Sequence, residues 1–509
     1  MKVTWSRLSQ ILFLIAFFFL FVTTEYRGKD EISVALNSFF RADPLVTVSY
    51  IFSRKAFTIL LLPGLLMTLF SMVLGRFFCG WICPLGTILD FTSKHIRKVA
   101  PISVLKTRFK YYLLFTLLFA ALFKVNLVGI LDPIAILVRA MTFFFYPLFG
   151  YSIRSSWAGL YGLVGEYRDY LDFLYDFFRD FLLPFRETFY PLAFLSLLLF
   201  VFIIVLERYE ERNWCRNLCP LGTLLGFLAR LSLFRRLPAR LCPDCKACKD
   251  VCPTGFDSEI LQKSDCILCM ECKLKCARSR VRFLLRGAGR EKASSPPPVM
   301  ERRVLLTGLL SGIFLSRGFS FRTPSGQERL LRPPGVNDEA EFLQKCVRCG
   351  ECMKVCLRSA LYPAFSQGGL HGLFMPLLIP RLGYCEYECN LCGQVCPTGA
   401  IPNLPLDRKK KSIIGLAAID KNHCLPYAKK INCIVCEEHC PIPGKAIRFE
   451  TVKEVDFYGK PVTLKRPYVL DDLCNGCGIC ENKCPLEGKS AIEVFSKKRG
   501  NHRGGKSPE

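Results

Sequence analysis

Six groups of four cysteines carry most of the chemistry that this sequence can perform. Four groups follow the spacing Cys-x2-Cys-x2-Cys-x3-Cys and two are stretched versions of it, and together they use 24 of the 28 cysteines. The regular groups are Cys242, Cys245, Cys248 and Cys252; Cys266, Cys269, Cys272 and Cys276; Cys346, Cys349, Cys352 and Cys356; and Cys474, Cys477, Cys480 and Cys484. The stretched groups are Cys385, Cys389, Cys392 and Cys396, and Cys424, Cys433, Cys436 and Cys440. Thiolates at this spacing hold 4Fe-4S clusters.

The spacing predicts that the groups work in pairs. Three thiols two residues apart lie on one tight loop, and the fourth cysteine reaches a neighbouring cluster, often released by a following proline. The ligand sets expected for the first two groups are Cys242, Cys245 and Cys248 with Cys276, and Cys266, Cys269 and Cys272 with Cys252. A disulfide framework or zinc sites would also use many cysteines. Sixfold recurrence of one triple favours six 4Fe-4S clusters instead.

A second cysteine motif occurs twice. Cys79 and Cys83, and later Cys215 and Cys219, each form Cys-x3-Cys-Pro-Leu-Gly-Thr directly after an apolar run. The chain is therefore built here from two related halves. The four thiols would form a redox-active thiol pair or a soft-metal site. In the alternative interpretation, Cys, Pro and Gly only shape the helix ends.

The composition indicates a membrane protein. The 509 residues are 51% hydrophobic and include 43 Phe, which is too apolar for a soluble ferredoxin. The net charge is +26, but Lys and Arg crowd the flanks of apolar runs, so no nucleic acid partner is expected. None of the five His lies in an apolar run, and Cys-x2-Cys-His, Gly-x-Gly-x-x-Gly and Walker motifs are missing. No haem, flavin or nucleotide is therefore expected.

Four uncharged runs predict transmembrane helices. They cover about residues 8–24, 56–75, 111–131 (interrupted by Lys124) and 188–206, each close to the roughly 20 residues that cross a bilayer. Basic residues concentrate in 94–110 and after the fourth run, which places both segments and the N-terminus in the cytoplasm. No small-residue cleavage site follows the first run, so we expect a retained anchor.

The segment between the third and fourth runs is expected outside. Asp169, Asp172, Asp176 and Asp180 recur at helical spacing opposite aromatic and leucine side chains. This pattern predicts a helix that lies in the membrane interface or packs on a partner, or alternatively on the other spans. The apolar stretch 140–153 would also suit a re-entrant segment.

Arg302 and Arg303 begin a fifth candidate span. Only 13 uncharged residues separate Arg303 from Arg317, which is short for a span but typical of a twin-arginine signal. Export of folded domains suits clusters that are inserted in the cytoplasm. We therefore expect two clusters inside and four outside. The alternative is a short helix in a wholly cytoplasmic protein.

The predicted fold combines a membrane α-helical domain, of four spans with a fifth candidate, and α+β bacterial ferredoxin-like domains. The boundaries are a transmembrane domain over 1–235, a two-cluster ferredoxin domain over 236–285, a linker over 286–329, a four-cluster ferredoxin domain over 330–496 and a basic tail over 497–509.

The order of these parts resembles known families. Four spans, two Cys-x3-Cys-Pro motifs and two cysteine groups, over about residues 1–285, resemble the NapH membrane polyferredoxins, with related modules in NosR and CcoG proteins. Leu331-Arg332-Pro333-Pro334-Gly335 followed by four groups is similar to the NapG ferredoxin subunit, over about 330–495. For these four groups the resemblance implies pairing of the first with the last and of the middle two.

The resemblance also implies a function. It implies electron transfer from membrane quinol toward periplasmic c-type cytochromes and a terminal reductase, nitrate reductase in the type system. The chain would be a component of a quinol dehydrogenase in the bacterial inner membrane, with cysteines as its working residues and no general acid or base. The CcoG-like resemblance leaves an alternative, an assembly factor that reduces or hands over a metal for a respiratory enzyme.

Overall fold

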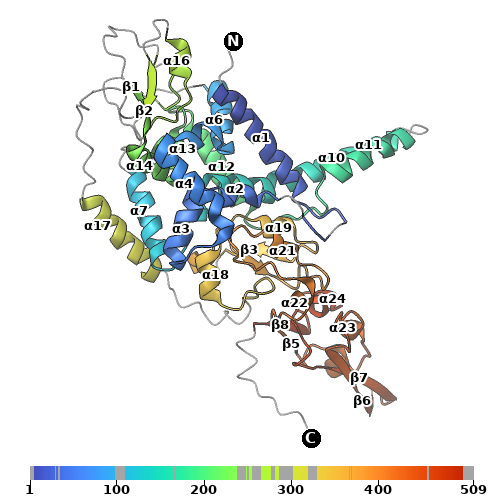
Figure 1. Cartoon of the computed structure of the whole chain (residues 1–509). Helices are drawn as coiled ribbons and strands as arrows, with labels where there is room; N and C mark the ends of the chain where they lie inside the picture. The colour runs from blue at the N-terminus through green and yellow to red at the C-terminus, as the bar shows by residue number, and fades with distance from the viewer. Residues whose placement is uncertain are drawn as a thin grey trace.

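The computed structural model describes residues 5–28, 30–32, 35–97, 109–163, 168–237, 248, 251–254, 265–276, 281–285, 302–318, 330–365, 367, 369–455 and 458–496. A helical domain occupies the middle of the molecule (Figure 1). Strands β1 (Phe234–Leu237) and β2 (Arg282–Leu285) lie at one end, and the C-terminal domain lies at the other (Figure 1). The helical domain therefore separates the two cysteine-rich parts of the chain.

The helical domain contains long apolar helices and short connecting ones. Its α-helices are α1 (Trp5–Thr23), α2 (Asn37–Arg41), α3 (Pro44–Arg54), α4 (Leu62–Leu74), α5 (Phe77–Trp81), α6 (Pro84–His95), α7 (Phe109–Leu122), α8 (Val128–Leu131), α9 (Pro133–Ala140), α10 (Tyr146–Leu163), α11 (Arg168–Phe181), α12 (Ala193–Leu206), α13 (Asn213–Asn217) and α14 (Pro220–Leu228). The 3-10 turns η1 (Ile59–Leu61) and η3 (Ala229–Leu231) and the π-helical turn η2 (Met141–Phe145) extend α4, α14 and α9.

The two halves of this domain share a structural plan. The Asp43 carboxylate accepts the Leu45 N–H (2.7 Å) at the start of α3, and the Asp132 carboxylate accepts the Ala135 N–H (2.8 Å) at the start of α9. Proline follows each aspartate, and the Cys-Pro steps likewise begin α6 and α14. Proline suits the first helical position because its missing N–H would have no acceptor there. The repeated sequence motifs thus correspond to repeated helix N-termini in the two halves.

Helices occupy all four predicted runs. These are α1, η1 with α4, α7 and α12. In the part of the chain that the structure describes, two helices are long and apolar enough to cross a membrane, Trp5–Thr23 and Pro133–Tyr161. The apolar helices Ile59–Leu74, Phe109–Leu122 and Ala193–Leu206 are shorter.

The helix Pro133–Tyr161, formed by α9, η2 and α10, was not expected as one continuous element. Arg139 Nη1 donates to the Arg348 carbonyl at 2.9 Å, and the Tyr146 ring centre lies 4.9 Å from Lys354 Nζ. This helix therefore follows the boundary with the C-terminal domain. The predicted amphipathic helix is confirmed as α11, which projects from the molecule (Figure 1) and leaves Phe173 80% exposed.

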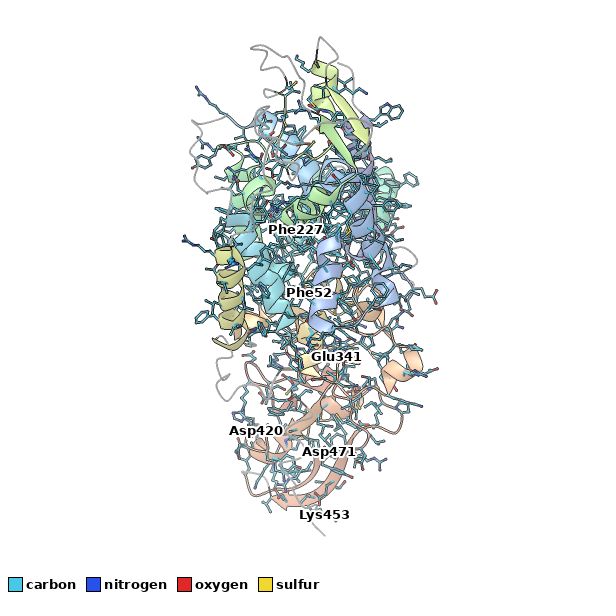
Figure 2. All side chains as sticks on the ribbon, turned by 60° about the vertical axis from the view of Figure 1, so that its left-hand side comes forward. Phe52, Phe227, Glu341, Asp420, Lys453 and Asp471 are labelled. Atoms are coloured by element: carbon cyan, nitrogen blue, oxygen red, sulfur yellow. The ribbon has the colours of Figure 1, made fainter. Side chains whose placement is uncertain are left out.

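The segment after the predicted linker forms α17 (Arg302–Ile313), which ends in the π-helical turn η4 (Phe314–Gly318) and packs along α7. In Figure 2 it is the yellow helix beside the cyan one. A Cβ atom added at Gly308 would lie 2.8 Å from Phe115 Cβ, and one at Gly312 would lie 2.6 Å from Phe119 Cβ. Glycines four residues apart allow such close approach. The later glycine in α17 meets the later phenylalanine in α7, so the two helices run in the same direction.

The C-terminal domain is built from short helices and strand pairs, as an α+β ferredoxin-like domain should be. Its strands are β3 (Leu361–Pro363), β4 (Pro376–Leu378), β5 (Leu416–Ile419), β6 (Ile447–Val455), β7 (Pro461–Val469) and β8 (Ile492–Phe495). They pair antiparallel as β3–β4, β5–β8 and β6–β7. Its helices are α18 (Glu339–Lys345), α19 (Glu351–Lys354), α20 (Gly369–Gly372), α21 (Leu391–Gln394), α22 (Leu406–Lys410), α23 (Val435–Glu438) and α24 (Ile479–Lys483), with the π-helical turn η6 (Leu425–Lys429).

Gly312→Leu should weaken the α17–α7 contact. The added side chain would force the two helices apart, and we expect the free energy of unfolding in detergent to fall by about 1–3 kcal/mol. Gly159→Leu is the matched control, since nothing lies within 4 Å of a Cβ at Gly159. Equal loss in both variants would contradict a close helix pair.

Candidate cluster-binding sites

Three regular cysteine groups share one backbone conformation. The second and fourth residues after the first cysteine have positive φ in each: Leu268 (55°) and Met270 (59°), Arg348 (55°) and Gly350 (90°), and Gly476 (70°) and Gly478 (85°). Alternation of right- and left-handed residues turns successive N–H groups toward a common centre, a concavity found at many iron–sulfur sites. The residues present therefore fit 4Fe-4S clusters. Glycine at three of these positions, Gly350, Gly476 and Gly478, is a sequence signal for this loop that the cysteine spacing does not use.

The structure corrects the expected pairing of the last four groups. Electrostatic interaction links Cys346, Cys349 and Cys352 with Cys396, and Cys385 and Cys392 with Cys356. It also links Cys424 with Cys484, and Cys433 and Cys436 interact in turn with Cys424. Cys474 and Cys477 interact in the same way with Cys440. Neighbouring groups along the chain thus exchange their fourth cysteines. The pairing of the first group with the last and of the middle two is wrong.

Burial controls the protonation of these thiols. It raises the pKa of Cys346 to about 11 and that of Cys477 to about 12, because a desolvated thiolate is unfavourable. Bound iron supplies the positive charge that a buried thiolate needs. Backbone N–H groups also reach the sulfurs, from Ala360 to Cys356 Sγ at 3.2 Å and from Ile401 to Cys396 Sγ at 3.3 Å. Such bonds tune cluster potentials.

The N-terminal groups keep the predicted arrangement where the structure describes them. Cys266, Cys269 and Cys272, the last in α16 (Glu271–Lys275), each interact electrostatically with Cys252, the predicted fourth member. Strand β1, before the first group, pairs antiparallel with β2, after the second. Cys242 and Cys245 lie outside the described residues, as do most of the predicted linker and the basic tail.

The loop from Cys266 to Cys272 docks on the beginning of α1. Ser6 Oγ donates to the Cys269 carbonyl at 2.8 Å, and Trp81 Nε1 donates to the Leu268 carbonyl at 3.1 Å. Lys110 Nζ, at the start of α7, lies 2.8 Å from the Asp265 carboxylate. These contacts define the Cys266 end of the helical domain.

The loop from Cys346 to Cys356 docks on the other end of α1. Lys354 Nζ donates to the carbonyls of Phe21 (2.5 Å) and Thr24 (2.6 Å), where a helix leaves its last carbonyls unpaired and favours a cation. Gly129 also lies against Val347, because a Cβ there would be 1.8 Å from the Val347 carbonyl oxygen. These contacts define the Cys346 end of the domain.

The four remaining cysteines gather near the Cys266 end. Cys79 and Cys215 both interact electrostatically with Cys83 and Cys219, and all four are buried. Arg76 Nη2 donates to the Cys215 carbonyl at 2.6 Å, and Arg212 Nη1 donates to the Cys79 carbonyl at 2.8 Å. Each half therefore supports the cysteine loop of the other. Neither arginine was predicted to have this role, although each stands three residues before the first cysteine of its motif.

The four thiols lie directly beside the N-terminal cluster loop. A Cβ at Gly80 would be 2.2 Å from the Ile267 carbonyl oxygen, and the Gly222 N–H donates to Cys219 Sγ at 3.3 Å. Among the described residues, no three or more His, Cys, Asp or Glu side chains are arranged to hold a metal ion, and this applies to these thiols and to the six groups. The cluster assignment therefore depends on spacing, grouping and backbone conformation.

Double substitutions should reveal which thiols share a cluster. Cys346→Ala with Cys396→Ala removes two ligands of one cluster, so it should cost about four iron, no more than either single variant. Cys346→Ala with Cys484→Ala should cost about eight, because it damages two clusters. Iron analysis of anaerobically purified protein measures both losses. The opposite order would restore the pairing of first group with last.

Comparisons with known proteins match parts of this chain. A family model described as "4Fe-4S binding domain" matches residues 56–103 and 191–238, the two segments that contain the Cys-x3-Cys-Pro motifs. The methylamine utilization ferredoxin-type protein MauM of Methylorubrum extorquens is 34% identical over 228 residues, covering 42% of this chain and 96% of that protein. No solved structure matches the chain.

Two further relatives match the resemblance found in the sequence. The ferredoxin-type protein NapG of Escherichia coli K12 is 36% identical over 196 residues, covering 36% of this chain and 81% of NapG. The ferredoxin-type protein NapH of Haemophilus influenzae is 26% identical over 306 residues, covering 55% of this chain and 89% of NapH. The chain therefore belongs to the family of NapG- and NapH-like ferredoxin-type proteins, which transfer electrons through iron–sulfur clusters.

Proposed function

We propose that this protein carries electrons from the membrane quinol pool through six 4Fe-4S clusters toward a c-type cytochrome or terminal reductase outside the bacterial inner membrane. One observation carries the proposal: the two cysteine-rich parts contact opposite ends of α1. The 19 residues of α1 give a length of about 28 Å, close to the hydrocarbon thickness of a bilayer. In this proposal two clusters lie on the cytoplasmic side and four on the periplasmic side.

The position of α17 supports this topology. Arg302 and Arg303 begin α17, and the contacts of Gly308 and Gly312 carry it in the same direction as α7. Lys110 near the start of α7 contacts the Cys266 end, whereas Asn126, just after α7, donates to the Gln344 carbonyl at the Cys346 end. Helix α17 thus takes the chain from one cysteine-rich part to the other. Its basic start suits the cytoplasmic side.

The four thiols Cys79, Cys83, Cys215 and Cys219 would add a relay beside the N-terminal clusters. The matched 4Fe-4S family model over both motifs supports a redox role for them. The close approach of Gly80 to Ile267 supports a position for them between these clusters and the helical core. A buried thiol set that changes redox state or holds a soft metal suits this place.

The topology can be tested with a reporter fused after Glu509. We expect a periplasmic signal, and Arg302→Lys combined with Arg303→Lys should abolish it, because twin-arginine export requires the arginine pair. Arg317→Lys is the matched control and should leave the signal intact. A cytoplasmic reporter in the wild-type protein would place all six clusters inside.

Quinol-driven reduction tests the electron path. Reduced quinol analogues should bleach the cluster absorbance of membranes that contain the wild-type protein with about 24 iron. Cys79→Ser with Cys215→Ser should remove about a third of this bleaching, since two of six clusters then lose their link. Dithionite should still reduce every cluster in the variant.

The same variant tests the assembly-factor alternative. Two copies of a paired thiol motif would also suit metal transfer. Unchanged bleaching, combined with loss of metal from a respiratory enzyme in the same cells, would favour that alternative. Reduction only by a soluble cytoplasmic donor would reverse the direction of electron flow.

A further inference from the structure

A crevice opens at the Cys346 end, between the end of α1, η2 and the loop Met353–Ser359. Its empty space is about 420 Å³ with the open solvent at its mouth included, and its own cavity volume is about 20 Å³, room for one water-sized group. Pro184 and Phe185 line it on one side, and Cys356 lines it on the other. The crevice is thus lined both by the helical domain and by a cysteine of the first C-terminal group.

The polar lining of the crevice is not satisfied by the protein. Thr142 Oγ1 and Tyr146 Oη are buried and have no hydrogen-bond partner among the described residues. The carboxylate of Glu25 lines the same crevice, and the three residues are 3%, 6% and 8% exposed. Leaving a buried oxygen without a partner is unfavourable. Two such oxygens beside a buried carboxylate in one crevice indicate a site for a ligand hydroxyl group.

Glu25 has the surroundings of a proton acceptor. Its Oε2 forms an ion pair with Lys354 Nζ at 3.2 Å, and its Oε1 accepts the Phe185 N–H at 3.3 Å. Burial raises the pKa of Glu25, while Lys354 and Arg27 oppose the shift. Because a carboxylate whose pKa is raised binds protons more readily near neutral pH, Glu25 can accept one and release it. Sequence analysis identified no general base, because burial and not a motif distinguishes Glu25.

We propose that this crevice is the quinol-oxidation site, with Glu25 as proton acceptor and Thr142 and Tyr146 as hydroxyl-binding residues. The inference rests on the proposed function. One quinol hydroxyl occupies the water-sized space, and the ring lies in the open part beside Pro184 and Phe185. Both O–H bonds break, the two protons leave in turn through Glu25, and the quinol becomes a quinone. Clusters held by cysteines of the C-terminal domain would take the two electrons, one each.

A photoreactive azido-quinone tests the location independently of turnover. With the full chain in membranes, we expect labelled peptides from 142–147 and 184–190, and excess unlabelled quinone should suppress the labelling. Tyr146→Phe removes one oxygen from the lining and should weaken binding about tenfold while iron content stays unchanged. Labelling confined to peptides around Cys79 and Cys215 would overturn the proposed site.

Glu25→Gln tests the proton acceptor. We expect quinol-driven bleaching to slow by about 100-fold or more, with iron content and dithionite reduction unchanged and Glu25→Asp retaining part of the rate. Glu187→Gln is the matched control, a carboxylate that does not line the crevice and pairs with Arg154 at 3.1 Å. A normal rate in Glu25→Gln overturns this site alone. If no quinol reduces the wild-type clusters, the proposed function fails, and the site with it.

Discussion

The length of one helix sets the distance between the two cysteine-rich parts. Helix α1 meets the Cys266 loop through Ser6 in its first turn and the Cys346 loop through the carbonyl of Phe21 in its last. Neither contact uses a cysteine side chain, because the Cys266 loop is held through a backbone carbonyl and the Cys346 loop through the Lys354 side chain. The remaining helices of the domain lie between the two cysteine-rich parts (Figure 1).

The two junctions are built differently. At the Cys266 end, side chains of the helical domain bond the carbonyls of the cluster loop. At the Cys346 end the bonds run both ways: Arg139 donates to the Arg348 carbonyl, and Arg348 donates to the carbonyls of Asn126 and His371. Burial lowers the pKa of Arg348 to about 10, which still leaves it charged at neutral pH. Truncating either arginine would leave buried carbonyls unpaired, so this junction should be permanent and not transient.

Periodic and spaced features were predictable from the sequence. Apolar runs located α1, α4, α7 and α12, and acid–aromatic periodicity located α11. Cysteine spacing predicts each loop because the first three cysteines of a group are local. The fourth cysteine is not local: Cys396 and Cys356 each interact with the cysteines of the other group, and spacing alone does not say which group is the neighbour. The continuous helix Pro133–Tyr161 was not predicted because its aromatic-rich middle, η2, packs against residues far along the chain: a Cβ at Gly350 would lie 3.2 Å from the Phe143 ring.

The reciprocal arginine contacts relate the two halves of the helical domain to each other. Arg76 supports Cys215 and Arg212 supports Cys79, which is the pattern of an isologous two-fold interface, where residue i meets j and j meets i. A chain with one copy of the motif would have its complement in a second copy of itself. When one chain contains both copies, they are present in a one-to-one ratio and their sequences can differ. Asp90 pairs with Arg212 at 2.6 Å, whereas the corresponding position in the second half is Gly226. The two sides of this contact are therefore related by sequence but distinguishable in structure.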